Sequence, residues 1–409
     1  MSNLGLRGRR ILTITGLLFL AACGGGGGSS VSSTPTLTVN GPNTDIPSPT
    51  TDTQTVIPTP ENVIAVSVAL GPSGPGLFFP NQSFVSLQLC QPNSSNCVTI
   101  DKVLLDTGSF GLRVFDSALA GLSLNASTYQ SRTLYQCAVF GSGYTQGPVR
   151  VADMKLGTLK APNLPLQVIE AGPRTVPSGC SQSGVGPITA PEQLGANGIL
   201  GVGALADDSG PLLVYYFVMQ GAQASLINGL PSTLRIPQPI TRLEKHNNGL
   251  ILNYPAVDLS GAPTLDAQLI LGLGTSDNNT TTGATFFTLS NSGRLRMAFN
   301  GTPYDGVIDS GANHYVFPYA YLPNCGGTVF FCPETPQTVH VAIGSYGATP
   351  RWISTLNLLD YKTYGSNAAQ PGLAGYTTGN NEFILGLPFF YGRKVFIAVQ
   401  GQSLSLIHI

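Results

Sequence analysis

The chain has 409 residues, of which 10% are charged, 42% are hydrophobic, 50 are glycine and 31 are proline. A formal net charge of −1, with no basic block, argues against nucleic acid as a partner. Abundant glycine, threonine, serine and valine indicate strands and turns, so a helical bundle is excluded and an all-β fold is expected.

The first 22 residues read as a secretory signal. Three arginines occur in residues 1–10, and residues 11–20 form an apolar run too short to span a bilayer as an ordinary helix. The run ends in Leu20-Ala21-Ala22-Cys23, which resembles a bacterial lipobox with an acylated cysteine; the alternative is an ordinary signal with a chance cysteine. We expect a lipoprotein signal peptide over 1–22, lipidation of Cys23, and a bacterial, extracytoplasmic protein anchored to a membrane, the outer one where the cell has one.

Residues 23–60 read as a lipid-anchored flexible linker. Five glycines at positions 24–28 are followed by serine, threonine, proline and asparagine, which cannot bury apolar surface. The root-mean-square reach of such a linker is on the order of 30–35 Å, enough to hold a folded body off a membrane surface.

The six cysteines after Cys23 follow the signal into an oxidising compartment, where disulfides are expected. Fifteen pairings are possible in principle. Short loops cost least to close, which favours two local pairs and leaves the remaining two cysteines for each other. The expected disulfides are Cys90–Cys97, Cys325–Cys332 and Cys137–Cys180. A zinc site built from Cys325, Cys332, His314 and His340 is the alternative, but its spacing matches no familiar zinc motif, so no metal is expected.

Two segments in the β-rich part of the chain resemble each other. Residues 103–109 and 306–312 each read as an apolar strand that runs into Asp-Thr/Ser-Gly. A third copy of the tripeptide, at 208–210, follows no apolar strand, and we expect only a turn there. The tripeptide alone carries little information, because short motifs recur by chance.

A second element makes the repetition informative. Ile199-Leu200-Gly201 follows the first Asp turn and Ile384-Leu385-Gly386 follows the second, so the same two-part signature occurs twice in order. This pattern indicates a duplicated domain.

With these motifs the chain resembles the pepsin-like aspartic proteases from about Asn62 onward. The resemblance implies a bilobal all-β fold, in which two related β-barrel lobes, residues 61–240 and 241–409, flank a cleft. More narrowly, the lipobox, the short cysteine loops and the segments 105–113 and 197–201 look like a bacterial lipoprotein family filed as a domain of unknown function.

The resemblance implies a catalytic pair, Asp106 and Asp309, that needs no cofactor. Two carboxylates about 3 Å apart cannot both ionise cheaply, so they share a proton. The ionised one removes a proton from water and the neutral one polarises the peptide carbonyl. The glycines are expected to allow a sharp turn and a close backbone approach, and the hydroxyls to tie the two loops together. These supporting residues are Thr107, Gly108, Ser109, Ser310 and Gly311.

Two features depart from the family pattern. Ala312 stands where a hydroxyl residue usually donates to the second aspartate. Phe140 occupies the position of the flap tyrosine, with Tyr144 nearby, and a phenylalanine can cover a substrate without hydrogen bonding. Both aromatic residues are flap candidates, although simple hairpin packing is the alternative. Residues 215–217, Tyr-Tyr-Phe, are expected in a helix packed on the first lobe.

The leading hypothesis is therefore a membrane-tethered aspartic endopeptidase that acts as a monomer on an extended peptide or protein. The alternative is a peptide- or protein-binding lipoprotein on the same fold, in which both aspartates are structural, because a fold does not fix a function. A glycoside hydrolase would place its carboxylates at least 5 Å apart, which the symmetric motifs argue against.

Overall fold

The computed structural model describes residues 59–74, 76–172, 174–208, 213–318, 322–326, 328–377, 382–400 and 406–408. The expected signal peptide and Cys23 lie outside these residues, as does nearly all of the expected linker. The described chain is almost entirely β, as the composition predicted, and its helices are single turns. These turns are α1 (Ser178–Ser181), α2 (Pro191–Leu194), η1 (Asp116–Leu119), η2 (Ser232–Leu234), η3 (Pro239–Arg242), η4 (Asp277–Asn279), η5 (Tyr361–Tyr364) and η6 (Leu387–Phe390).

Half of the strands precede residue 240 in the chain. They are β1 (Val63–Val68), β2 (Ser83–Cys90), β3 (Cys97–Asp106), β4 (Phe110–Phe115), β5 (Asn125–Ala126), β6 (Thr128–Tyr129), β7 (Arg132–Phe140), β8 (Gly143–Leu156), β9 (Leu159–Ile169), β10 (Gly198–Val202), β11 (Val214–Gln220) and β12 (Gln223–Leu226).

The other strands follow residue 240. They are β13 (Gly249–Asn253), β14 (Leu265–Leu271), β15 (Phe286–Thr288), β16 (Leu295–Phe299), β17 (Thr302–Ile308), β18 (Tyr315–Val316), β19 (Gln337–Gly344), β20 (Trp352–Leu358), β21 (Ala374–Gly375), β22 (Glu382–Leu385), β23 (Lys394–Ala398) and β24 (Leu406–His408).

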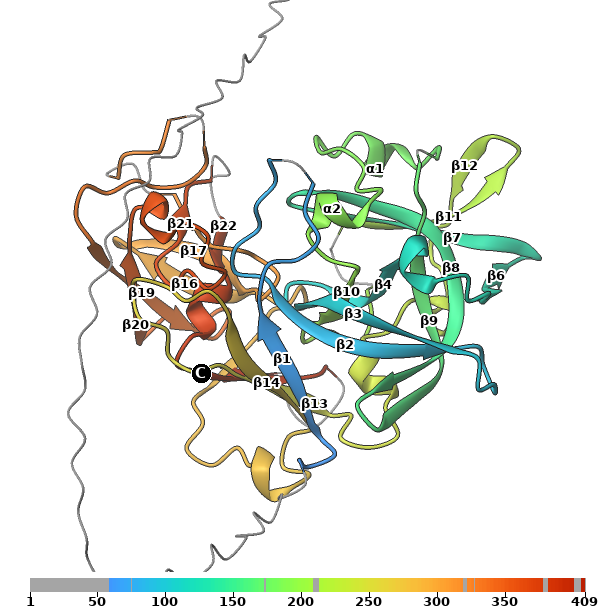
Figure 1. Ribbon diagram of the computed structural model, residues 1–409, viewed down its shortest axis with the longest axis horizontal. Helices are drawn as coiled ribbons and strands as arrows, with labels where there is room; N and C mark the ends of the chain where they lie inside the picture. The colour runs from blue at the N-terminus through green and yellow to red at the C-terminus, as the bar shows by residue number, and fades with distance from the viewer. Residues whose placement is uncertain are drawn as a thin grey trace, which may run out of the picture. The chain divides into compact units, whose positions relative to one another are not determined.

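One sheet joins strands from the two ends of the chain. The first strand, β1, pairs with both β2 and β14, and β13 lies between β14 and β23, to which β24 adds. Figure 1 shows β1, β13 and β14 side by side in the middle of the molecule. β15 pairs with β24 in this same sheet, and the other strands of the second half form a separate seven-stranded sheet in the order β20-β19-β16-β17-β22-β18-β21.

The same strand arrangement occurs once in each half. In the first half, β10 runs parallel to β3 and antiparallel to β4. In the second half, β22 runs parallel to β17 and antiparallel to β18. The strands β3 and β17, which precede the two Asp turns, therefore have equivalent neighbours. Buried side chains of these strands and of their parallel partners belong to one apolar cluster: Leu105, Leu200, Ile308 and Leu385.

The structure forms the three disulfides that the sequence predicted. Two of them close short loops, with Cα–Cα distances of 3.9 Å for Cys90–Cys97 and 5.2 Å for Cys325–Cys332. The third, Cys137–Cys180, ties β7 to α1 at a Cα–Cα distance of 6.5 Å. These bonds suit a protein of an oxidising compartment.

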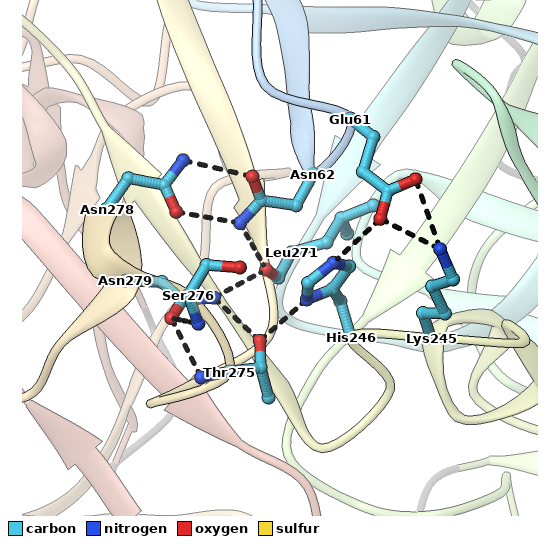
Figure 2. Close-up of polar contacts among 9 residues, drawn as sticks. All are labelled: Glu61, Asn62, Lys245, His246, Leu271, Thr275, Ser276, Asn278 and Asn279. Carbon is cyan, nitrogen blue, oxygen red and sulfur yellow. Dashed lines mark hydrogen bonds and ion pairs between the residues drawn. The ribbon is translucent and has the colours of Figure 1, made fainter.

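A polar network fixes the start of β1 (Figure 2). The buried Asn62 donates to the carbonyl oxygen of Leu271 at 3.1 Å and exchanges two hydrogen bonds of 2.9 Å with Asn278. Beside it, Glu61 forms an ion pair of 3.1 Å with Lys245. The network satisfies buried polar groups where β1 enters the sheet, which sets the register of β1 against β14.

The expected helix at residues 215–217 is wrong. These residues lie in β11, which pairs with β7 on one side and β12 on the other. Aromatic and β-branched residues favour a pleated, half-buried surface, and here that preference governs the local structure. Among the described residues, every helix is too short to cross a lipid bilayer.

Candidate functional site

Each Asp turn begins where a buried strand ends. Asp106 is the last residue of β3 and pairs with Gly201 of the parallel strand β10. Asp309 follows β17 directly, and its backbone N–H donates to the carbonyl oxygen of Leu385 in β22 at 2.9 Å. The two parallel pairings hold both aspartates at equivalent positions.

The two carboxyl groups are held in the same way and lie against each other. The N–H of Gly108 donates to Oδ1 of Asp106, and the N–H of Gly311 donates to Oδ1 of Asp309, both at 2.8 Å. A Cβ atom on Gly108 would lie 2.6 Å from Oδ1 of Asp309, and one on Gly311 would lie 2.6 Å from Oδ1 of Asp106. Each glycine is therefore required because the opposite carboxyl group occupies the space of a side chain, and not for a left-handed φ.

Reciprocal hydrogen bonds join the two turns. The N–H of Thr107 donates to Oγ of Ser310 at 3.1 Å, and the N–H of Ser310 donates to Oγ1 of Thr107 at 2.9 Å. Each hydroxyl then donates across the contact, Thr107 to the carbonyl oxygen of Ile308 at 2.9 Å and Ser310 to that of Leu105 at 2.7 Å. Because both side chains are buried, these four bonds fix the spacing of the aspartates.

The symmetry breaks at the fourth residue of each turn. The Ser109 hydroxyl donates to Oδ2 of Asp106. At the equivalent position only the backbone N–H of Ala312 is available, and it donates to Oδ1 of Asp309 at 3.2 Å. The amide of Asn313 does not replace the missing hydroxyl, because it donates to the carbonyl oxygen of Pro80.

This asymmetry is accompanied by a perturbed carboxyl group. Burial raises the pKa of Asp309 well above its ordinary value, and the negative charge of Asp106 and a hydrogen bond with its carboxyl group raise it further. The backbone N–H groups of Gly311 and Ala312 oppose this rise but do not cancel it. Asp309 therefore retains a proton to higher pH than an ordinary aspartate.

The two flap candidates lie at the turn between β7 and β8 but differ in environment. Phe140 pairs with Gly143 to close the hairpin and is half-buried. Tyr144 is buried against the Cys137–Cys180 disulfide and Phe217, so it is a core residue of the hairpin base. Of the two, Phe140 is the less buried, and it packs against a second apolar cluster that includes Phe115 and Ile188.

A buried ion pair that was not predicted from the sequence lies beside this hairpin. Arg113 of β4 lies 3.5 Å from Asp208, and the side chains are 1% and 0% exposed. Asp208 belongs to the third copy of the tripeptide, for which only a turn was expected. Two features of the sequence could have indicated this ion pair: the basic residue Arg113, seven positions after Asp106, and the acid Asp208 in the third copy of the tripeptide.

The four residues of the alternative zinc site do not form one cluster in the described part of the chain: Cys325 and Cys332 lie together with Asp360, but neither His314 nor His340 belongs to this group. Sγ of Cys332 lies 3.2 Å from Oδ1 of Asp360, but both sulfur atoms of the Cys325–Cys332 loop are in the disulfide and are not thiolate ligands. His314 packs edge-on against Phe330, with ring centroids 5.1 Å apart.

Two surface hollows, of about 530 and 310 Å³, are lined by residues other than those of the two Asp turns.

Comparison with known protein families matches most of the chain. A family model described as a protein of unknown function, DUF3443, matches residues 58–408. No curated protein matches the chain.

Proposed function

Because the chain belongs to the DUF3443 family, a family described only as proteins of unknown function, we propose its activity from the site itself. The protein is an extracytoplasmic aspartic endopeptidase that hydrolyses peptide bonds with water activated by Asp106 and Asp309. The observation that carries this proposal is the pair of facing carboxyl groups, each held by the N–H of the glycine two residues on.

The asymmetry of the pair assigns the two roles. Asp309 has a raised pKa and keeps the shared proton, whereas Asp106, which accepts from the Ser109 hydroxyl, acts as the base. Asp106 removes a proton from the bound water, whose oxygen attacks the peptide carbonyl carbon. Asp309 gives its proton to the carbonyl oxygen as the tetrahedral intermediate forms. Collapse of the intermediate breaks the C–N bond: the proton held by Asp106 passes to the leaving nitrogen, and one hydroxyl of the intermediate returns its proton to Asp309 as the carboxylic acid forms, which restores the dyad.

The proposed fold is the two-lobed one of the pepsin-like proteases, with lobes at 61–240 and 241–409. The repeated pairing of β10 with β3 and β4, and of β22 with β17 and β18, supports it. A groove between two such lobes suits an extended peptide, which binds partly through main-chain hydrogen bonds. The lipobox supports anchoring through Cys23 to a membrane.

A binding lipoprotein without catalysis is the second candidate. It is favoured by Ala312, which leaves Asp309 without a hydroxyl donor, and by the burial of Tyr144, the remaining candidate for a flap hydroxyl. In that case the two aspartates stabilise the contact between the turns, and the protein binds peptides without cleaving them.

Peptide cleavage tests the proposal. The full-length protein is incubated with a peptide library between pH 3 and 7, beside Asp106→Asn and Asp309→Asn. Asp258→Asn is the matched control, because Asp258 is exposed and distant in sequence from both turns. The proposal expects cleavage by the wild type and the control alone. Cleavage by all four proteins alike, or by none, would reject the protease.

Binding of an uncleavable peptide measures whether Asp106 takes part in recognition of the cleaved bond, as the protease requires. Calorimetry with a peptide that carries a hydroxyethylene group in place of the cleaved bond measures affinity without turnover. A protease should bind it more weakly after Asp106→Asn, because the ionised carboxylate no longer accepts a hydrogen bond from the hydroxyl.

A further inference from the structure

Arg113 is a fully buried cation close to the Asp106 turn. Its Nη1 donates to the carbonyl oxygen of Phe110 at 2.7 Å, and its guanidinium lies 5.6 Å from the centre of the Phe140 ring. Burial lowers its pKa, while Asp208, Tyr216 and Asp106 act in the opposite direction. A buried guanidinium without a partner is strongly destabilising, so the position of Asp208 fixes that of Arg113.

Besides the ion pair with Arg113 of β4, Asp208 is held by side chains of two further strands. It accepts hydrogen bonds from Gln136 of β7 and from the hydroxyl of Tyr216 in β11, the latter at 2.8 Å to Oδ1. The Tyr216 hydroxyl in turn accepts from the backbone N–H of Ile236 at 2.7 Å. The Arg113–Asp208 pair therefore joins β4, β7 and β11 at one buried point.

Two short paths lead from this pair to the parts that a peptide would meet. The first passes from Arg113 to the Phe110 carbonyl and its chain neighbour Ser109, whose hydroxyl donates to Asp106. The second passes from Arg113 to Phe140 at the closed end of the β7–β8 hairpin. Among the described contacts, the pair makes no hydrogen bond or ion pair to either carboxyl group of the dyad. The charges of Arg113 and Asp106 act on each other through space, so hydrogen exchange of the hairpin, and not activity alone, must report a positioning effect.

We propose that the Arg113–Asp208 ion pair is a positioning device that holds the Asp106 turn and the β7–β8 hairpin in one arrangement over a bound peptide. This inference rests on the proposed peptidase function. Phe140 is the hairpin residue that closes on the substrate, and the guanidinium beneath its ring sets its place.

The device depends on pH through Asp208. Burial raises the pKa of Asp208 to about 6, although Arg113, Tyr216 and Gln136 oppose the rise; the neighbouring Asp207 adds to it. Above about pH 6 the carboxylate is ionised and attracts the guanidinium, and below it the neutral acid attracts it less. Asp208→Asn imitates the neutral form at every pH.

Hydrogen exchange of the full-length protein tests the hairpin without reference to activity. The reporters are the N–H groups of Val139 and Tyr144, which donate to the carbonyl oxygens of Leu213 and Gly186, both at 2.9 Å. At pH 7.5, Asp208→Asn should lower their protection factors at least tenfold, and at pH 5 it should match the wild type. Equal protection at both pH values would overturn the proposal.

A second ion pair supplies the matched control. Arg296 lies 2.9 Å from Asp305 and its guanidinium lies 5.5 Å from the Tyr346 ring, an arrangement like that of Arg113 but partly exposed. Asp305→Asn should change neither the hairpin protection nor cleavage. If it lowers both as Asp208→Asn does, the effect is general and the proposal fails.

Kinetics then separate positioning from simple stability. The ratio of kcat/KM between the wild type and Asp208→Asn should be close to one at pH 5 and at least ten at pH 7.5. Arg113→Lys should retain more activity than Arg113→Met, because the charge remains. A ratio that does not change with pH would contradict the device. If the wild type cleaves nothing, the peptidase proposal fails alone, and the exchange data still decide whether the pair orders the hairpin.

Discussion

Replacing Thr107 by valine removes two of the four hydrogen bonds between the Asp turns while keeping the shape of the side chain. Valine cannot accept from the N–H of Ser310 or donate to the carbonyl oxygen of Ile308, which are the 2.9 Å bonds of Thr107. Since Ser310 is fully buried and Thr107 nearly so, water does not readily replace either partner. Each buried group left unpaired costs roughly 1–3 kcal/mol, so the free energy of unfolding should fall by about 3 kcal/mol.

Urea unfolding of the full-length protein measures this change. Fluorescence of Trp352, the sole tryptophan, and circular dichroism report the transition. Thr338→Val is the control, because this exposed threonine donates only to Asn357 on the surface, at 3.1 Å. The control should lose no more than about 0.5 kcal/mol. If Thr107→Val loses no more than the control, the hydrogen bonds between the turns do not stabilise the protein and the reasoning is refuted.

Three further changes have defined outcomes. Ala312→Ser should supply Asp309 with the donor that Ser109 gives Asp106, which favours ionisation of the acid that must stay protonated and moves the alkaline limb of kcat/KM to lower pH by about one unit; an unchanged or raised alkaline limb contradicts this. Burial lowers the pKa of His314 to about 4. Between about pH 6.5 and 4 the unfolded state therefore binds a proton that the folded state does not bind, and the free energy of unfolding decreases as the pH is lowered. Guanidinium unfolding at pH 7 and 4.5 should therefore show a loss smaller by about 2 kcal/mol in His314→Phe than in the wild type. Cys23→Ser should shift the protein from the membrane to the soluble fraction after a high-salt wash, because a lipid chain is the expected anchor.

The parts of the fold that follow from local patterns were predictable. Alternating apolar runs with glycine and proline between them predicted strands, and loop length alone predicted the Cys90–Cys97 and Cys325–Cys332 disulfides. The repeated signature predicted that the turns at Asp106 and Asp309 are equivalent, and the structure brings them into contact. Their catalytic role stays a prediction.

The parts that depend on distant neighbours were not predictable. Residues 215–217 read as a helix because their local sequence does not reveal that β7 and β12 lie on either side of them. Tyr144 read as a flap candidate because its burial depends on a disulfide whose second cysteine, Cys180, lies far along the chain. The glycines of the two turns were expected to allow a sharp turn and a close approach to the carboxylates; the close approach is present, but only the structure shows that each glycine faces the opposite carboxyl group.

The three copies of Asp-hydroxyl-Gly show how a distant partner decides the chemistry of one motif. Burial raises the pKa of both Asp309 and Asp208, but the neighbouring charge acts in opposite directions. Asp106 raises the pKa of Asp309 further, so that pair tends to share a proton. Arg113 lowers the pKa of Asp208, so that pair tends towards two opposite charges. What separates the two outcomes is the partner: the hydrogen bonds between the two turns bring a second carboxyl group to Asp309, whereas β4 brings a guanidinium to Asp208. The tripeptide therefore indicates a proton-sharing site only when its strand and its partner are both identified.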